Sequence, residues 1–533
     1  MGSKGERLGT LRLRHEHTNE IILIPTPSSD PNDPLNWPYW YKYYVLGLAA
    51  WSIFLCTVGS AGPAVVIPNM AISFFGPPGP FFLHAIGQAS YFFTVAALMM
   101  GVSNVVWVPL MVKYGRRWVY IASFILYAAT CVWCACAKTY GSMLAARAIL
   151  GCAAGAGEVL GPLTIADIFF VHERGTMMVI YTCLLSMGTS IGAIISGVIT
   201  IRHDWRLIFW VCFALTAATA LLMFLTMPET TFIRDTALAT SHLADAGRPP
   251  VEDKETPVAL VENTRVHRST IPGTPPSFAQ VIGTWPTRAF TGEALWKLAL
   301  RPIALIILPS ALWCSLVMAV SIGFLVAMST NISTAFSAYY HFTTWQIGVS
   351  LISGVIGSVA AVWFGGPLSD RCSDYLTKRN GGIKEPEFRL PAMAVSLVTG
   401  PLSLILYGVG IEKQLHWICP VVGMGLINFT IVQAANISVV YMIDCYRPIA
   451  GEVTQTQYLF KSLFGFLLSF YTNGWIEHSG YLPAFGEMAV ISFVVFLFFV
   501  VFYIWGKPLR RRSWHWPVFR SIAQWDKDRE VGE

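Results

Sequence analysis

The chain has 533 residues, of which 54% are hydrophobic and only 12% charged, and its formal net charge is +6. Soluble domains carry about 25% charged residues, so this composition excludes an ordinary soluble globular protein and indicates a chain that crosses a membrane many times. We therefore expect a lipid bilayer around it, and the small net charge gives no reason to expect a nucleic-acid partner.

The first 42 residues are polar and contain several prolines without hydrophobic periodicity, which predicts an unfolded arm over residues 1–42. The start lacks the pattern of a cleaved signal peptide, so the first apolar span is expected to act as its own insertion signal. Six apolar stretches follow, each near the 20 residues that a helix needs to cross the hydrocarbon layer. They are expected near 43–67, 85–112, 117–137, 141–168, 177–200 and 205–227.

A polar segment at 228–300, rich in Pro and Thr, separates this first half (43–227) from a second half at 301–506. A basic tail follows at 507–533. The second half contains six further apolar stretches, expected near 302–328, 345–368, 390–411, 415–441, 450–474 and 484–506. The predicted fold is an all-α membrane protein with twelve transmembrane helices in two six-helix halves.

The loops on the two sides of the predicted membrane differ in basic residues. An even number of spans puts both termini on one side, and the loops of that side hold most of the Lys and Arg residues. Because positive loops stay on the cytoplasmic side, the pattern predicts that the termini and the central segment are cytoplasmic.

The fourth span carries two charges, Arg147 and Glu158, within an apolar length. A charge at the centre of a membrane helix costs about 2.5–3.5 kcal/mol on insertion scales, so such groups are expected to face a protein interior or a cavity. The two residues are eleven positions apart, which at about 100° per residue returns to nearly the same helix face. Alternatively, the helix only packs, with Arg147 near an interface and Glu158 satisfied by its neighbours. Small residues let other helices approach this span closely: Gly151, Gly155, Gly157 and Gly161.

The eleventh span has a polar face that includes Gln457, Tyr458 and Lys461, and the tenth span adds Asn436. A polar face inside a membrane is expected to look into a cavity, so these residues are the predicted lining of a substrate cavity. Lys461 there could repel cations, bind an anionic group, or pair with a carboxylate across the cavity.

The remaining short motifs bear on modification and metals. NIS at 331–333 is a glycosylation sequon in a predicted outward loop, which makes Asn331 a candidate glycosylation site. Cys131, Cys134 and Cys136 lie on one apolar helix without His or carboxylate nearby, and we interpret them as small buried residues with no metal. The phosphate loop of ATP-driven pumps is absent, and no nucleophile triad stands out, so we expect no enzyme.

Over roughly residues 30 to 510 the chain resembles the major facilitator superfamily, and within it the fungal drug:proton antiporter-like branch. The elements that carry the resemblance are DPNDPLNW before the first span, GRR (115–117), Arg147 with Gly151, ADIFFVHERG (166–175), DWRLIF (204–209), PET (228–230), GGPLSDR (365–371) and RNGGIKEPEFRLP (379–391).

The resemblance implies a gate motif in the loop after the second span of each half. In the family, a carboxylate in this loop pairs with basic groups and helix ends and latches the cytoplasmic side. The first copy keeps Gly115, Arg116 and Arg117 but has Val112 in place of the Asp. The second copy matches better, with residues Gly366, Asp370 and Arg371. The basic residues of both copies also serve to fix topology.

The resemblance further implies that Arg147 takes part in proton coupling, and Glu158 on the same stripe is our candidate proton carrier. Asp167 at the end of that helix is expected to pair with Arg174 or to cap the turn.

These features predict a secondary transporter that exports small organic molecules, such as drugs or secondary metabolites, across the plasma membrane. We expect a monomer that uses the proton gradient and no cofactor. One alternative is proton-coupled uptake of organic cations or polyamines, and another is a non-transporting receptor built on the same fold.

Overall fold

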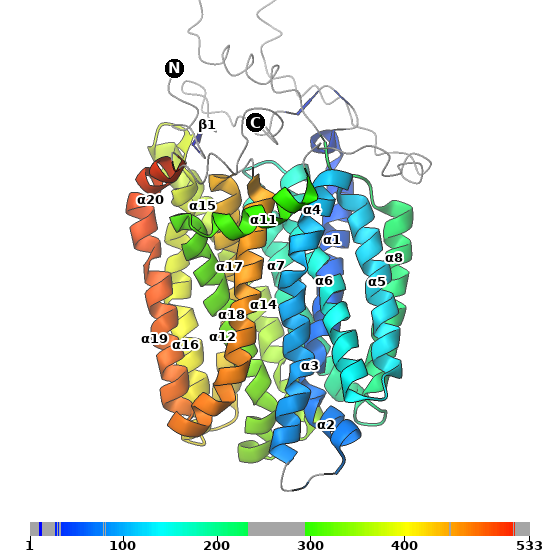
Figure 1. Cartoon of the computed structure of the whole chain (residues 1–533). Helices are drawn as coiled ribbons and strands as arrows, with labels where there is room; N and C mark the ends of the chain where they lie inside the picture. The colour runs from blue at the N-terminus through cyan, green and yellow to red at the C-terminus, as the bar shows by residue number, and fades with distance from the viewer. Residues whose placement is uncertain are drawn as a thin grey trace, which may run out of the picture.

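The computed structural model of the chain describes residues 10–12, 27–28, 30, 33–77, 79, 82–232, 294–446, 449–514 and 516. The described residues form a bundle of long helices that run in nearly the same direction (Figure 1). Helix α1 begins and α20 ends at one end of this bundle, which we call the terminal end.

The first half of the bundle contains the helices that are blue to cyan-green in Figure 1. They are α1 (Tyr39–Ala61), η3 (Gly62–Val66), α2 (Ile67–Phe75), α3 (Phe82–Val102), α4 (Asn104–Tyr114), α5 (Arg116–Cys136), α6 (Tyr140–Ile168), α7 (Arg174–Ile199) and α8 (Arg206–Thr226).

The second half contains the helices that are green to red. They are α11 (Leu295–Leu305), α12 (Pro309–Tyr340), α13 (Thr344–Ser350), α14 (Ile352–Gly365), α15 (Pro367–Arg379), η5 (Pro386–Met393), α16 (Ala394–Glu412), α17 (Ile418–Cys445), α18 (Ala450–Ser479), α19 (Tyr481–Leu497) and α20 (Phe499–Trp514).

Within the described residues, eleven helical segments are long and apolar enough to cross a membrane. The twelfth is α18, whose 30 residues span about 45 Å but whose first turns carry Glu452, Gln455 and Lys461. Helix α18 corresponds to the predicted eleventh span, and the polar face predicted for that span lowers its mean hydropathy. The twelve-helix fold in two halves is therefore confirmed.

Several predicted boundaries are wrong. The predicted unfolded arm includes the short helix η2 (Pro34–Asn36), which Asp33 caps through the backbone N–H of Leu35, and α1 already begins at Tyr39. The arm also contains strand β1 (Leu11–Arg12), which pairs antiparallel with β2 (Ile383–Lys384).

The segments predicted as central loop and tail also contain helix. The predicted central segment 228–300 contains the start of α11 at Leu295, and its residues 233–293 lie outside the described part of the chain. The predicted tail begins inside α20, which continues to Trp514. Hydropathy alone ends a helix where its surface becomes polar, so it shortens helices whose ends leave the apolar layer.

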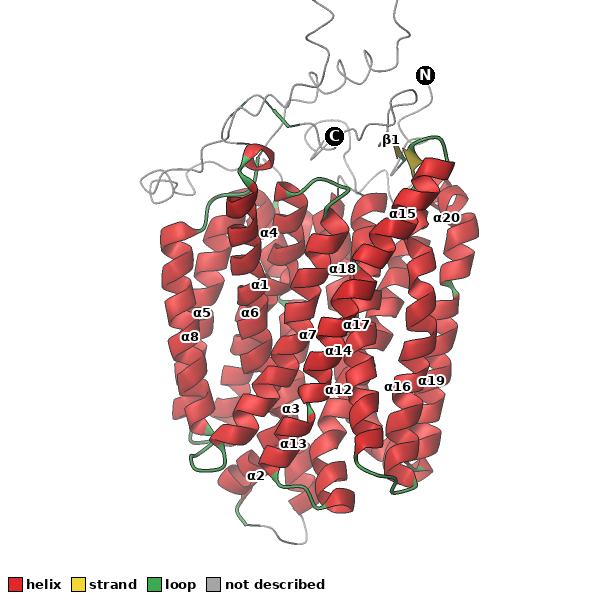
Figure 2. Cartoon of the chain, turned by 180° about the vertical axis from the view of Figure 1, so that it is seen from behind, coloured by secondary structure: helices red, strands yellow, loops and turns green. Residues whose placement is uncertain are grey.

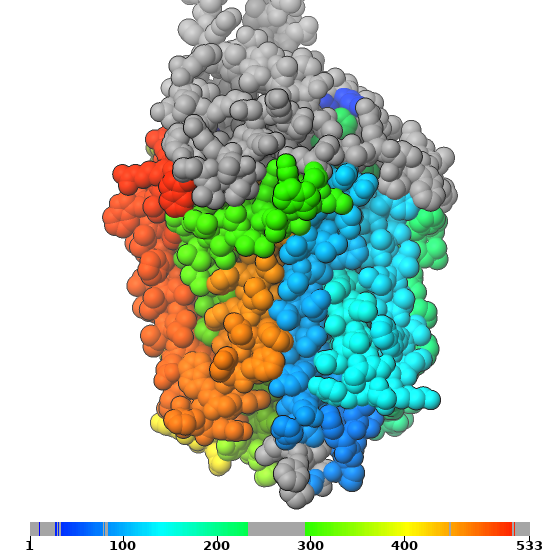
Figure 3. Space-filling model, in the orientation of Figure 1, coloured from blue at the N-terminus to red at the C-terminus, as the bar shows by residue number. Residues whose placement is uncertain are grey.

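The two halves meet along two seams. On the front of the molecule, α18 lies beside α3 (Figure 3). On the back, α7 packs against α14 and α17 (Figure 2). At the end opposite the terminal end, Gly197 of α7 comes so close to α13 that a Cβ there would lie 3.3 Å from the Cα of Gly348.

Glycines of α6 bring it into contact with its neighbours. A Cβ at Gly151 would lie 2.3 Å from the carbonyl oxygen of Ala96, and one at Gly155 would lie 2.2 Å from that of Met100. Both acceptors belong to α3, so the two helices touch through their backbones. The predicted role of these glycines in close packing is confirmed.

Gly151→Ala is expected to destabilise the protein by about 1–3 kcal/mol, because the new methyl group meets a backbone atom that cannot rotate away. Thermal unfolding of the purified protein in detergent measures this loss. Gly47→Ala in α1 is the matched control, since nothing lies within 4 Å of its Cβ position. Equal unfolding temperatures for the two variants would contradict the close contact of α6 and α3.

Candidate functional site

A cavity lies between the two halves near the middle of the bundle. It has a volume of about 120 Å³ and is lined by α1, η3, α3, α6 and α7 of the first half and by α12, α17 and α18 of the second. Most of its wall is apolar, with hydroxyl groups from residues such as Thr57, Thr94 and Ser190. Among the described residues that line it, Glu158 and Lys461 are the charged ones.

Glu158 and Lys461 form an ion pair across this cavity. Lys461 Nζ donates to Glu158 Oε1, and the two side chains are only 3% and 7% exposed. Lys461 Nζ also lies 4.8 Å from the centre of the Tyr458 ring, which holds a cation favourably against its π face. Within the described chain, Glu158 Oε2 has no hydrogen-bond partner. The pair thus joins α6 to α18 and leaves one carboxylate oxygen free to accept a further donor.

The backbone around Glu158 is shaped by Pro162, four residues further along α6. Because proline has no N–H, the carbonyl of Glu158 lacks its usual helical partner. The Tyr181 hydroxyl of α7 replaces it and donates to the carbonyls of Glu158 at 3.0 Å and Gly157 at 2.8 Å. Gly161 makes room, since a Cβ there would lie 2.0 Å from the Tyr181 ring. Sequence analysis missed Tyr181, although a proline four residues after a buried carboxylate indicates a free carbonyl.

Arg147 does not lie at the cavity wall. Its guanidinium, 1% exposed, donates to three backbone carbonyls, those of Phe92, Gly59 and Ser60. These contacts tie α6 to α3 and to the end of α1. The structure therefore does not join Arg147 to Glu158, as expected from their separation along one helix, and a role of Arg147 in proton coupling stays a prediction.

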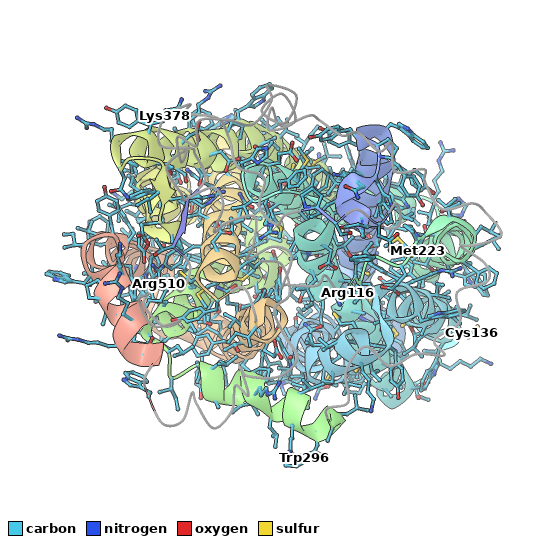
Figure 4. All side chains as sticks on the ribbon, turned by 90° about the horizontal axis from the view of Figure 1, so that it is seen from above. Arg116, Cys136, Met223, Trp296, Lys378 and Arg510 are labelled. Atoms are coloured by element: carbon cyan, nitrogen blue, oxygen red, sulfur yellow. The ribbon has the colours of Figure 1, made fainter. Side chains whose placement is uncertain are left out.

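The first gate motif is closed by a carboxylate from elsewhere in the chain. Gly115 adopts φ +93° between α4 and α5, and Glu229 accepts from the backbone N–H groups of Arg116 at 2.9 Å and Arg117 at 3.2 Å. The Arg116 guanidinium lies 3.2 Å from Asp167 at the end of α6. Glu229 and Asp167 thus contribute the negative charge that the loop itself lacks, and Figure 4 shows Arg116 among the helix ends.

The second gate motif joins the two halves, with a different basic partner from the one expected. Asp370 of α15 accepts from Arg389 of η5 and from the Thr176 hydroxyl of α7, the latter at 2.7 Å. Arg371, the basic residue of the predicted motif, is exposed, and Arg389 forms the ion pair with Asp370. Gly366 lets α7 approach, because a Cβ there would lie 3.1 Å from the Cα of Thr176.

Asp444, near the end of α17, extends this contact into a buried network. Its carboxylate is 1% exposed and lies 3.3 Å from Arg389 Nε, 3.8 Å from Lys384 Nζ and 3.9 Å from Arg174 of the first half. Arg174 therefore pairs with Asp444, and the expected pairing of Asp167 with Arg174 is wrong. The network gives the terminal end a set of charges that spans both halves.

Three of the four predicted cavity residues lie elsewhere. Gln457, Tyr458 and Asn436 are buried but do not line the cavity. Asn436 instead lies near the backbone carbonyl of Gly175, towards the terminal end. The helix faces of α17 and α18 that carry these residues are polar, as predicted, but these three side chains are buried away from the cavity.

A further polar contact crosses the cavity wall, and its two serines were not assigned to the site by sequence analysis. Ser186 of α7 donates to the Asn428 side chain of α17 at 2.8 Å, and Ser358 of α14 donates to Ser186 at 2.9 Å. These two hydrogen bonds link the halves through neutral groups on the back seam. The sequence around each serine is apolar and carries no charge, so these hydrogen bonds could not be predicted from it.

Asn331 does not lie in a loop. Helix α12 continues through it to Tyr340, and its side chain is 5% exposed and faces Asn473 of α18 at 3.4 Å. The predicted outward loop at 329–344 is therefore mostly helix. Because a sequon must be accessible to be glycosylated, the prediction of Asn331 as a glycosylation site is wrong for this fold.

The cysteines of α5 do not form a site. Cys131 and Cys134 are buried, whereas Cys136 is exposed. Throughout the described part of the chain, no group of three or more His, Cys, Asp or Glu side chains is placed to hold a metal ion.

Arg147→Lys is expected to destabilise the protein by about 1.5–3 kcal/mol for each charged hydrogen bond that a lysine cannot reproduce. The measurement is the unfolding temperature of the purified protein in detergent. Arg206→Lys is the control, because Arg206 is about one third exposed and, besides its ion pair with Asp204, donates to one distant backbone carbonyl, that of Ala137, where Arg147 donates to three. If both variants unfold together, the three carbonyl contacts do not hold α1, α3 and α6 in place.

The chain matches the description "Major Facilitator Superfamily" over residues 49–444. An uncharacterised MFS-type transporter of Schizosaccharomyces pombe is 25% identical over 522 residues, which cover 92% of this chain and 88% of that protein. Protein HOL1 of Saccharomyces cerevisiae is 25% identical over 552 residues, covering 93% and 91%. The solved proton:xylose symporter XylE from E. coli superimposes with a TM-score of 0.60 at 13% identity, covering 88% and 97%, which shows a shared fold.

Proposed function

The chain belongs to the Major Facilitator Superfamily, and from this premise we propose that it exports small organic molecules in exchange for protons. The observation that carries the proposal is the Glu158–Lys461 ion pair, which joins the two halves inside the central cavity. A carboxylate that can take up a proton, placed between the two parts that must move, links protonation to conformation.

Protonation of Glu158 removes its negative charge and leaves Lys461 without its anion. The two halves then lose an attraction across the cavity, which changes the balance between their arrangements. A substrate that enters meets the same carboxylate, whose Oε2 is without a partner among the described residues. Proton and substrate therefore compete for one group, which supports exchange in opposite directions.

The cavity wall supports an amphipathic substrate. Its mostly apolar surface suits a hydrophobic body, and its hydroxyl groups and the one ion pair suit a few polar atoms. A volume of about 120 Å³ is below the roughly 300–1,000 Å³ of pockets that hold drug-sized ligands, so we expect the halves to separate when such a molecule enters.

Uptake of organic cations or polyamines is the second candidate. The free oxygen of Glu158 favours it, because a ligand ammonium could donate there. Lys461 weighs against a polycation, since its charge lies at the same point of the wall. A non-transporting receptor is the third, and any substrate flux by the purified protein would exclude it.

The protein is a multi-pass membrane protein, and we place it in the plasma membrane with both termini cytoplasmic. The basic residues at the terminal end support this orientation, among them Arg116, Arg117, Arg379 and Arg512. We further propose that it works as a monomer and that the proton gradient drives it without a cofactor.

Glu158→Gln is expected to remove the dependence of transport on the pH gradient while substrate binding survives in part. Gln keeps the shape and can still accept from Lys461, but it cannot carry a proton. The measurement is flux in proteoliposomes against an imposed pH gradient, with rhodamine 6G as the export probe and spermidine as the uptake probe.

Glu477→Gln is the matched control for this test, since its carboxylate is exposed on the same helix as Lys461. It should keep the gradient dependence of the wild type. If Glu158→Gln keeps it as well, Glu158 is not the proton carrier.

Asp370→Asn is expected to slow transport roughly tenfold, because a charge-assisted hydrogen bond contributes about 1.5–3 kcal/mol and this one joins the halves. The same flux assay measures the change, with the amount of protein in the membrane determined in parallel. Asp374→Asn is the control, because that carboxylate lies on the same helix, is about half exposed and pairs with Lys378 of the same helix. Wild-type flux for Asp370→Asn would show that the second gate motif is dispensable.

A further inference from the structure

Helix α11 lies across the bundle rather than along it. In Figure 1 it crosses the terminal end between the two halves, and in Figure 3 its atoms are visible on the front face. It packs against α18 of its own half and against α4 of the other half. Viewed from above, Trp296 points away from the bundle at its outer edge (Figure 4).

The inner face of α11 is fixed to α18. Its buried residues follow one helical stripe and include Leu298, Arg301 and Pro302. Arg301 lies 3.7 Å from Glu452 of α18, and the Thr456 hydroxyl donates to the carbonyl of Pro302 at 2.8 Å. An ion pair and a hydrogen bond therefore hold α11 to the helix that carries Lys461.

The outer face is a second stripe, and it is apolar. Trp296 is 62% exposed, Leu300 54% and Ile303 55%, and Ile307 just beyond the helix end is 55% exposed. Their spacing of four, three and four residues places them on one side of the helix. The stripe continues onto Leu312 of the membrane-spanning helix α12, which is 41% exposed.

Two features show which surroundings fit this stripe. It leads into Leu312 in the first turn of α12, so its C-terminal end lies where a membrane-spanning helix begins. Lys297 lies with its Nζ 5.7 Å from the Trp296 ring centre, and tryptophan beside lysine is typical of the layer between lipid chains and headgroups.

We propose that α11 is a membrane-surface helix whose outer stripe lies in the phospholipid leaflet at the terminal end, and that it braces α4 against α18 from there. An amphipathic helix of this kind lies in the plane of the membrane with its apolar face among the upper parts of the lipid chains. Because α11 contacts both halves, separating them at this end requires the helix to leave α4 while it stays in the lipid. The helix thus links the leaflet to the junction of the halves.

The position of α11 is tested by fluorescence quenching, which needs no transport and so stands apart from the proposed function. An unnatural fluorescent amino acid replaces Leu300 in the full chain, reconstituted in phosphatidylcholine vesicles with or without bromine on the lipid chains. Tyr375 is the matched control position, because it is 59% exposed on the polar helix α15.

Brominated lipid should quench the label at 300 about threefold more strongly than the label at 375, and aqueous iodide should do the reverse. Iodide quenching at 300 as strong as at 375 would overturn the proposal, since the stripe would face water. Quenching at 300 by neither agent would also overturn it, because a protein surface would then cover the stripe.

The proposed bracing role of α11 is tested by placing a negative charge on its outer stripe. Leu300→Glu should reduce flux in proteoliposomes about fivefold, whereas Leu300→Met and Tyr375→Glu should each leave it near the wild-type value. Unfolding temperatures in detergent identify loss of the fold. Wild-type flux for a folded Leu300→Glu variant would show that α11 does not brace the halves.

Discussion

The interior of a membrane gives an isolated charge no water to bind, and this constraint organises the protein. Glu158 and Lys461 satisfy it by pairing, and because they come from different halves, the pairing also sets how the halves meet. The same rule applies at the terminal end, where buried Arg389 lies between Asp370 and Asp444. Contacts in the middle of the bundle and at its terminal end thus both pair buried charges. A change of charge at either place alters the attraction between the halves.

The first half has the properties of one rigid body around its charged residue. Arg147 ties α6 to α1 and α3, and Tyr181 ties α6 to α7. Both use backbone carbonyls as acceptors, which cannot rotate away as side chains can. Motion between conformations is then expected along the seams between the halves, where side-chain contacts such as Thr176 with Asp370 can exchange partners.

Hydropathy and helical period sufficed to predict the twelve helices and the functional interest of Glu158, and the pairing of Lys461 with a carboxylate was one of three options considered. The partner itself could not be predicted, because Glu158 and Lys461 are 303 residues apart and only packing brings them together. The prediction that Asn331 lies in a loop failed because a polar stretch inside α12 resembles, in sequence, the end of a membrane span. The partner of Asp370 was missed because Arg371 is its neighbour in sequence but Arg389 is its neighbour in space.

The pairing of β1 with β2 has a consequence for how the protein is made. Thr10 beside β1 donates to Glu385 beside β2, and these residues are 375 positions apart. At about 5–20 residues per second, the ribosome needs roughly 20–75 s to supply the second strand after the first. During that interval the N-terminal strand has no partner, and it can dock only after the chain has been synthesised as far as Lys384, inside the second half. The small sheet therefore forms late in biogenesis, after the first half has entered the membrane.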